Sequence, residues 1–421
     1  MALVAYLINL ETRYRKCDGE GLGLFLSADR SLVPGGHDLG GQIQHCRYLE
    51  RECQSRLPEG LDAVAHDVLR AMEATYLGNA EEAHGHYYSA LNLFIDRIFV
   101  KLEQGLWALP CLYRMVTTIR KLAKTADGAK GGNSNPAFSG ALEGEGEENS
   151  GTTCMVRTTQ VLMKAFRAAM NDRRTEPSVS RKRASVHLAV DMFKHYDDLK
   201  NLRMCNNVRG LVAKSADQVE PLADKGDLVA YKYYIGLLSI VEDKYDDADE
   251  ALVYALQHCH RRATRNKRRI LNYLVPLRMR LGKFPSLRLL EKNGITHFYQ
   301  FALAIRSGNI GEFDTLMERW GKVFITQGSY LLMEKCRILA YRCLIRRIMV
   351  ATGEPKLPLA LVQFALRRMG QDKDEAETQC LLANLIFKVD LQHNGLCGNT
   401  CAATVPVPCA VAGMCTGYST K

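Results

Sequence analysis

The chain has 421 residues, a length that allows one large core or two to three domains. Hydrophobic residues make up 47% and charged residues 24%, as in an ordinary soluble protein, and no stretch reaches the roughly 18 uninterrupted apolar residues of a membrane helix. The 56 Lys and Arg against 46 Asp and Glu give a net charge of +10, which favours an acidic partner, either a nucleic acid or an acidic protein.

The cysteines and the chain start indicate the compartment. The 14 cysteines are scattered singly through the chain, many of them in apolar segments, which is typical of reduced core thiols in the cytosol or nucleus. The start "MALVAYLINLETRYRKC" has only a short apolar run, with no basic residue before it and no clear cleavage site. We therefore predict no signal peptide.

Helical periodicity dominates the rest of the sequence. From residue 61 to 120, apolar residues recur at spacings of three and four, and no long run alternates like a strand. Residues 227–259 contain one helical-repeat unit, with Gly236 where two helices cross and Ala248, Leu252 and Ala255 on the second helix. Because one such unit cannot bury its own apolar face, we predict an all-α, right-handed stack of tetratricopeptide-like helical pairs.

Two further pairs follow, with breaks at 282–285 and 308–311, and three helices after residue 330 indicate a winged-helix cap. The cap's β-hairpin wing is expected after Lys388, but the tail "VDLQHNGLCGNTCAATVPVPCAVAGMCTGYSTK" is small, apolar and rich in turn residues. We predict a poorly ordered tail with a missing or rudimentary wing and exposed, metal-free cysteines.

The insertion "TADGAKGGNSNPAFSGALEGEGEENSGTT" is rich in Gly, Ser, Asn and Glu, and we predict that it is disordered. The sequence thus divides into six segments. They are an N-terminal segment (1–56), N-terminal helical repeats (57–124), the disordered insertion (125–153), the helical-repeat part of a C-terminal domain (154–329), the winged-helix part of that domain (330–388) and the divergent tail (389–421).

Several stretches resemble a known family. They are "WALPCLYRM", "YKYYIGLL", "LQHCHRRATRNKRRILNYLVPLRMRLGKFP", "ALAIRSGNIGEFDTLM", "LLMEKCRILAYRCLIRRI" and "LLANLIF". They are similar to the PCI-domain subunit of the nuclear transcription-export complex, over roughly residues 57–387 outside the insertion. PCI domains consist of a helical-repeat arm that ends in a winged helix. The first fifty or so residues and the tail do not match the family.

This resemblance implies a non-catalytic scaffold role in mRNA export at the nuclear pore. It implies two protein partners, a large mRNA-export scaffold subunit and a small acidic protein of the proteasome-lid type. It also implies a nuclear location associated with the pore and envelope, with a cytoplasmic fraction allowed, and no membrane insertion. PCI domains also occur in proteasome-lid and COP9-signalosome-type assemblies, so a purely protein–protein role is the alternative.

The segment from Arg261 to Arg269 is the main candidate site, because six of its nine residues are basic. Asn266 is the predicted N-cap of the helix that follows, which puts the first arginines in a loop. Cations at a helix N-terminus are unfavourable for stability, which argues for an external anion. The segment could be a solvated charged turn, a contact with nucleic-acid phosphates or a contact with an acidic protein. Its basic residues are Arg261, Arg262, Arg265, Lys267, Arg268 and Arg269.

The predicted winged helix offers a second set of cations. Arg342 and Arg346 are four residues apart and share a helix face. A winged helix can present arginines to phosphates without reading bases, although such residues can equally serve solubility. The candidates are Arg342, Arg346, Arg347, Arg367 and Arg368. No aromatic-rich RNA-recognition motif is present, so we expect RNA and double-stranded DNA to be bound without sequence specificity.

Other motifs predict neither a cofactor nor a catalytic centre. Three consecutive residues on a helix point about 100° apart, so His258, Cys259 and His260 cannot converge on one metal ion. In the tail, only Cys397 and Cys401 have zinc-ligand spacing. The run "GEGLGLFL" lacks the strand–helix context of a dinucleotide site, and no P-loop, G-x-S-x-G or H-E-x-x-H motif is found.

Overall fold

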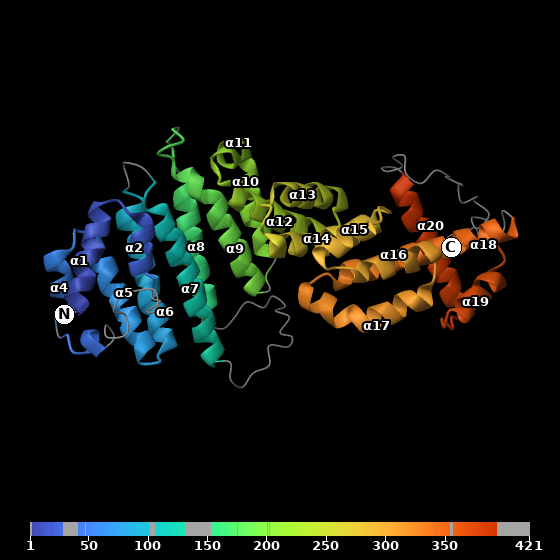
Figure 1. Cartoon of the computed structure of the whole chain (residues 1–421), viewed down its shortest axis with the longest axis horizontal. Coiled ribbons are helices and arrows are strands. Elements are labelled where there is room, and N and C mark those ends of the chain that lie inside the picture. The colour runs from blue at the N-terminus through green and yellow to red at the C-terminus, as the bar shows by residue number, and fades with distance from the viewer. Residues whose placement is uncertain are drawn as a thin grey trace, which may run out of the picture. The chain divides into compact units, whose positions relative to one another are not determined.

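The computed structural model describes residues 2–27, 41–46, 48–101, 106–130, 153–174, 176–199, 201, 203–353 and 357–393. Across these ranges the chain forms helices joined by turns and contains no strand, which confirms the predicted all-α class (Figure 1). The chain forms two compact units, Met1–Leu238 and Ser239–Lys421. None of the described helices is long and apolar enough to cross a membrane.

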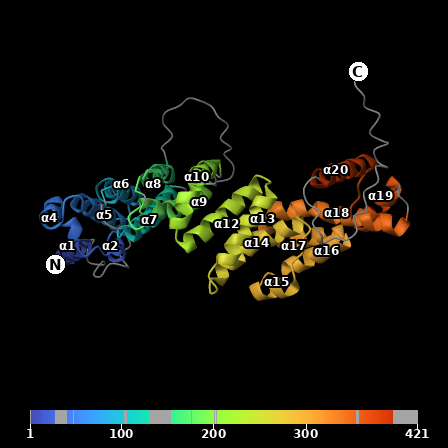
Figure 2. The ribbon, with the colours of Figure 1, turned by 90° about the horizontal axis from the view of Figure 1, so that it is seen from above.

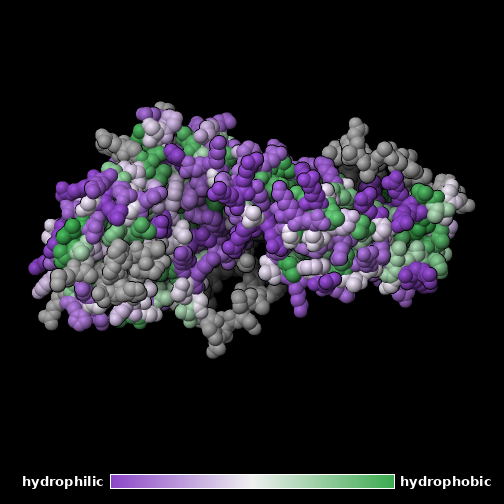
Figure 3. Space-filling view, in the orientation of Figure 1, coloured by the Kyte–Doolittle hydropathy of each residue, from purple (hydrophilic) through white to green (hydrophobic). Residues whose placement is uncertain are grey.

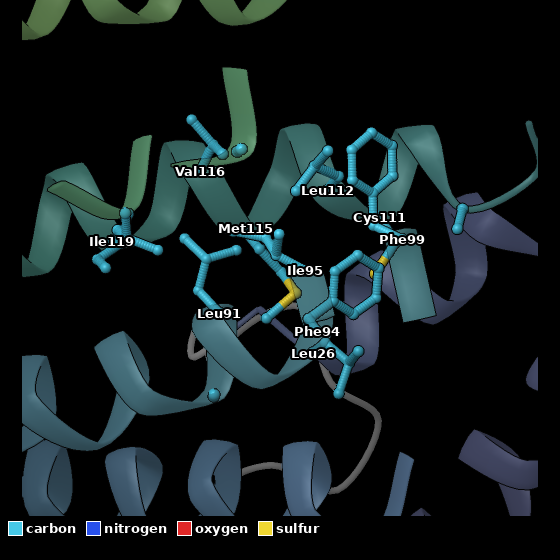
Figure 4. Close-up of a cluster of buried hydrophobic side chains, with 14 of the residues drawn as sticks. Leu26, Leu91, Phe94, Ile95, Phe99, Cys111, Leu112, Met115, Val116 and Ile119 are labelled. Atoms are coloured by element: carbon cyan, nitrogen blue, oxygen red, sulfur yellow. The ribbon is translucent and has the colours of Figure 1, made fainter. Parts of the chain in front are cut away.

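The first unit contains α1 (Ala2–Arg15), α2 (Gly19–Phe25), α4 (Leu49–Arg56), α5 (Leu61–Tyr76), α6 (Ala80–Leu93), the π-helix η2 (Phe94–Phe99), α7 (Leu109–Lys130), α8 (Cys154–Met170), the 3₁₀ helix η3 (Arg181–Ala184), α9 (Ser185–Asp198), α10 (Arg203–Lys214), α11 (Ala216–Val219), the 3₁₀ helix η4 (Glu220–Leu222) and most of α12 (Lys225–Val241). The last three residues of α12 belong to the second unit. From α5 to α9, each α-helix packs against the next along the chain. Leu91, Phe94 and Met115 meet in this core and are fully buried (Figure 4).

The glycines of "GEGLGLFL" allow close packing between α2 and α7. A Cβ atom on Gly19 would lie 1.6 Å from the carbonyl oxygen of Trp107, and one on Gly23 would lie 3.0 Å from the Cα atom of Cys111. Only a residue without a side chain fits at Gly19, because no atom can approach a backbone oxygen so closely. The motif therefore has a packing role in the first unit.

Helix α7 extends further than the sequence predicted. It continues to Lys130, six residues into the predicted insertion, so the prediction of disorder was wrong for residues 125–130. These residues have partners on α8: Ala126 is buried beside Cys154 and Met155, and the Asp127 carboxylate accepts hydrogen bonds from the backbone N–H groups of both, at 2.9 Å each. The insertion's residues 131–152 lie outside the described residues.

The second unit contains α13 (Tyr245–His258), α14 (Thr264–Arg280), α15 (Leu287–Asn293), α16 (His297–Ser307), α17 (Ile310–Gln327), α18 (Tyr330–Thr352), α19 (Leu359–Arg368) and α20 (Glu375–His393). Both predicted breaks in the helical pairs are confirmed, because Gly282 and Gly308 have positive φ angles after α14 and α16. The neighbours α16, α17 and α18 pack on one another (Figure 2). Ala248, Leu252 and Ala255 form the buried face of α13, as the repeat pattern predicted.

The last helix also differs from the expectation. Helix α20 continues to His393, five residues beyond Lys388, where the wing was expected to begin. The residues "VDLQH" contain neither Gly nor Pro, so nothing stops the helix before Asn394. The wing and the disordered tail remain predictions, because residues 394–421 lie outside the described part of the chain.

Candidate nucleic-acid interface

Six basic residues gather where α13 ends and α14 begins. We call them the Arg261–Arg269 cluster: Arg261, Arg262, Arg265, Lys267, Arg268 and Arg269. The first two lie in the turn between the helices, and the other four lie in the first two turns of α14. All five arginines are exposed, whereas Lys267 is half-buried with its Nζ atom 3.5 Å from the carbonyl oxygen of Arg261. The helix thus presents most of its N-terminal charge to solvent.

The start of α14 lies earlier than predicted. The N-cap is Ala263, and the proposed N-cap Asn266 lies inside the helix. Helical hydrogen bonding has already begun there, since the Lys267 N–H donates to the carbonyl oxygen of Ala263 at 3.0 Å. Arg265 is therefore part of the first turn, where it is held by the helix backbone rather than by a loop.

The electrostatics of this end are unbalanced. None of the cluster's six residues forms an ion pair with any acidic side chain in the described ranges. The first turn of α14 contains no acidic residue, and its N-cap supplies no side-chain hydrogen bond. The helix macrodipole adds about half a positive charge at the same place. The cluster is consequently a site of concentrated positive potential that no acidic side chain of the described residues neutralises by an ion pair.

His297, the first residue of α16, lies within the electrostatic reach of the cluster. Its ring is buried and stacks on Trp320 with 4.7 Å between centroids. Burial, followed by the positive charge of Arg268, lowers the pKa of His297 to about 4. His297 therefore stays neutral near pH 7 and adds no charge of its own to that of Arg268.

The other end of α14 is built differently. Arg278 forms an ion pair with Asp249 of α13 at 2.8 Å, and the guanidinium carbon of Arg280 lies 5.7 Å from the ring centre of Tyr245. These two arginines hold α13 against α14. Basic residues on one helix thus divide into an internal pair and an outward-facing cluster.

The arginines predicted on the winged helix are only partly available. Arg342, Arg346 and Arg347 are exposed on α18, but Arg347 donates a hydrogen bond of 2.5 Å to the carbonyl oxygen of Ser307, at the end of α16. Arg342 has no acidic partner in the described ranges. Arg347 is therefore already used to cap a neighbouring helix.

The α19 arginines, Arg367 and Arg368, are exposed, and Arg367 forms a 3.2 Å ion pair with Asp372. That pair is solvated on both sides, with side chains 65% and 88% exposed, so it can exchange for another anion at little cost.

The predicted basic residues do not form one patch. The Arg261–Arg269 cluster influences His297 at the start of α16, whereas Arg347 binds Ser307 at its end. With eleven residues, α16 places these ends about 15 Å apart. The second unit therefore carries at least two separate basic sites.

Comparison with known proteins identifies the family. No family model matches the chain. A PCI domain-containing protein 2 homolog from Dictyostelium discoideum is 32% identical over 305 residues, which cover 72% of this chain and 69% of that protein. PCI domain-containing protein 2 from Xenopus laevis is 28% identical over 341 residues, covering 80% and 81%. The chain belongs to the PCI domain-containing protein 2 family.

Membership confirms the resemblance to a PCI-domain protein. The chain is also similar to a differently named protein: a "Protein CSN12 homolog" from Mycosarcoma maydis is 29% identical over 361 residues, which cover 79% of this chain and 76% of that protein. The matches extend over most of the chain, so they include helices of both units.

The sequence did not lead us to an aromatic pair that lies beside the Arg261–Arg269 cluster. His258 stacks on Tyr254, with 4.0 Å between ring centroids and 21° between planes. The two residues are four apart on the last turn of α13, and this i, i+4 spacing of two rings was the available signal. In space, the pair lies at the end of the turn that carries Arg261 and Arg262.

The three residues of "HCH" lie in different environments. The Nδ1 atom of His258 lies 2.9 Å from the carbonyl oxygen of Tyr254, Cys259 is buried, and His260 is exposed with Nδ1 accepting from the Arg262 N–H. Across the described ranges, no group of three or more His, Cys, Asp or Glu residues is arranged to hold a metal ion. The tail cysteines lie outside those ranges.

Proposed function

We propose that this PCI-domain protein is a non-catalytic scaffold subunit of a nuclear, pore-associated mRNA-export complex, and that it contacts RNA and double-stranded DNA without sequence specificity. The Arg261–Arg269 cluster carries the proposal, because five exposed arginines lie within nine residues and have no acidic partner in the part of the chain that the structure describes. Guanidinium groups suit phosphate oxygens, which accept paired hydrogen bonds from them.

Phosphate contacts at an exposed surface do not require a pocket. Each cation that neutralises a phosphate releases condensed counterions, and this entropy drives binding regardless of sequence. Arg342, Arg346, Arg367 and Arg368 would extend the contact beyond α16, with affinity spread over two basic sites. We expect Arg347 to contribute less, because its guanidinium already binds Ser307.

The proposed partners are a large mRNA-export scaffold subunit and a small acidic protein of the proteasome-lid type. Support comes from the family and from the surface of the second unit. Phe364 on α19 and Phe387 on α20 are 62% and 64% exposed, an unusual state for phenylalanine. In Figure 3, green apolar residues interrupt the purple hydrophilic surface around these last helices. Such residues are typical of protein contacts.

The alternative is a purely protein–protein role in a proteasome-lid or COP9-signalosome-type assembly. The name of the Mycosarcoma maydis relative, "Protein CSN12 homolog", favours this reading. Purification of the tagged full-length chain from its own cells, followed by mass spectrometry, separates the two. Export-scaffold subunits in the eluate support the first proposal, and signalosome or lid subunits without nucleic acid support the second.

A binding measurement tests the nucleic-acid part directly. Changing Arg261, Arg262, Arg265, Arg268 and Arg269 to Ala in the co-purified complex should weaken binding to RNA and DNA alike. The slope of log affinity against log salt should become shallower by about four. Unchanged affinity in a folded variant would exclude the cluster as the binding site.

A matched control separates the site from net charge. The control variant replaces five exposed cations of the first unit that have no acidic partner among the described residues. These are Lys121, Arg173, Arg203, Lys214 and Lys225. Both variants lose five charges, so only the cluster variant should lose affinity strongly.

A further inference from the structure

We propose that single-stranded nucleic acid is the preferred ligand of the Arg261–Arg269 cluster, and that His258 provides the surface on which a base stacks. This inference rests on the proposed function and adds the strand form and the stacking residue. It is carried by the aromatic pair at the end of α13, an observation independent of the arginines.

The His258 ring is exposed but held in place. Tyr254 covers one of its faces, so its exposed area lies on the opposite face and the ring edge. A carbonyl oxygen can only accept a hydrogen bond, so Nδ1 carries the proton that is donated to the Tyr254 carbonyl. This bond and the stack fix the ring before any ligand arrives, which lowers the entropy cost of binding.

The ring and the cations are close enough to serve one strand. Arg261 is three positions after His258, so their Cα atoms lie no more than about 11 Å apart. Helix α13 ends at His258, and its C-cap Cys259 is buried, which turns the following residues toward the start of α14. A strand whose phosphates contact the turn would therefore bring a neighbouring base within reach of the ring.

This arrangement favours a single strand over a duplex. Bases in a duplex are stacked on one another, so their faces cannot reach a side chain without melting. Proteins that bind single strands commonly combine a positive surface with aromatic rings, and His is among the side chains that stack on bases. A phosphate-only site, in contrast, does not need an ordered ring beside it.

The test compares strand forms with His258→Ala in the intact, partner-bound protein. The probes are a labelled oligouridylate of about 12 nucleotides, within the span of known single-strand sites, and an RNA duplex of the same length. We expect His258→Ala to bind the single strand about tenfold more weakly, with duplex affinity and salt slope unchanged. His258→Phe, which keeps a ring, should recover most of the loss.

A matched histidine serves as the control. His45 is also exposed, and its Nδ1 lies 2.7 Å from the carbonyl oxygen of Gly41, four residues earlier. His45 belongs to the first unit, so His45→Ala removes the same kind of contact outside the Arg261–Arg269 cluster, and single-strand affinity should not change. Equal losses of single-strand and duplex binding in His258→Ala, or failure of His258→Phe to rescue, would overturn the stacking role.

The outcomes also separate this inference from the proposed function. If the five-arginine variant loses binding but His258→Ala does not, the phosphate site stands and the stacking role is wrong. If the wild-type complex binds neither probe, both proposals fail, and an acidic protein becomes the expected ligand of the cluster.

Discussion

The basic segment at residues 181–183 and the Arg261–Arg269 cluster have a similar density of charge in the sequence but opposite surroundings in the fold. In the first segment each cation has an internal partner: Arg181 with Asp172, Lys182 with Gln218, and Arg183 with Asp224. In the cluster, no arginine has an acidic partner among the described residues. The first segment therefore fastens loops and helices together, whereas the second is available to an external anion.

Asp172 shows how strongly the first segment is integrated. Burial alone would raise the pKa of its carboxyl group, but the backbone N–H and the guanidinium of Arg181 hold the pKa below its usual value. The carboxylate thus stays charged inside the fold. A basic run by itself does not indicate a binding site, because its meaning depends on the acids that the fold brings to it.

The largest expected effect comes from breaking the internal segment. Arg181→Ala should destabilise the protein by about 3 kcal/mol, because it removes the guanidinium 3.3 Å from the buried Asp172 carboxylate and leaves only the longer, 3.8 Å contact with Arg174. Urea unfolding measures the change. Adding Asp172→Asn should recover part of the loss, since the buried charge that Arg174 compensates only weakly is then gone. A loss below about 1 kcal/mol would show that the pair is not structural.

A second test uses pH on the same region. His187 lies between Asp191 and Asp227 and stacks on Tyr113, with 3.7 Å between ring centroids. Burial alone would lower the pKa of His187, but hydrogen bonds and charges from both carboxylates raise it to about 9. Because the folded pKa lies above the unfolded value, this stabilisation is complete below about pH 6.5 and is lost as the pH rises through 9.

The size of this pH effect follows from the shift. Deprotonation should remove about 2 to 3 kcal/mol of stability between pH 6 and pH 10. Urea unfolding at several pH values measures it, and His187→Asn should show a correspondingly flatter profile. Parallel profiles for the two proteins would contradict the assignment.

Helix α18 carries one arginine that contacts another helix, Arg347, and one without an acidic partner in the described ranges, Arg342, so the two kinds of arginine can be compared within one helix. Arg347→Ala should cost about 1 kcal/mol, because the last carbonyl of α16 loses a charged donor, whereas Arg342→Ala should change stability by less than about 0.3 kcal/mol. Thermal unfolding of both variants is the measurement. Equal effects would mean that the Ser307 contact contributes nothing.

The smallest expected effect concerns the cluster itself. The five-arginine variant should unfold within about 0.5 kcal/mol of the wild type, and any change should be stabilising, because repelling cations leave the positive end of α14. Urea unfolding checks this. A clear destabilisation would show that the cluster stabilises the fold, as residues 181–183 do.

The sequence by itself determined the all-α class, the helical pairs and the buried face of α14. Ile270, Leu274 and Leu277 recur at helical spacings of four and three and are buried, although Leu281, the next residue in that pattern, is only half-buried. The breaks at Gly282 and Gly308 lie where glycine was expected to end a helix. These features depend on local periodicity and backbone freedom, which neighbouring residues carry. The exposure of the cluster's arginines was also predictable, since isolated charges are rarely buried.

Tertiary structure alone decided which charges are free and where some helices end. Helix α7 continues to Lys130 because Ala126 and Asp127 meet α8, more than twenty residues later in the chain. Folding brings the Ser307 carbonyl oxygen to Arg347, which donates a hydrogen bond to it. Folding likewise brings Asp172 to Arg181, with which it forms an ion pair. Composition fixes how many cations a chain has, but Coulomb energy depends on distance and burial, and those are set only when distant segments pack together.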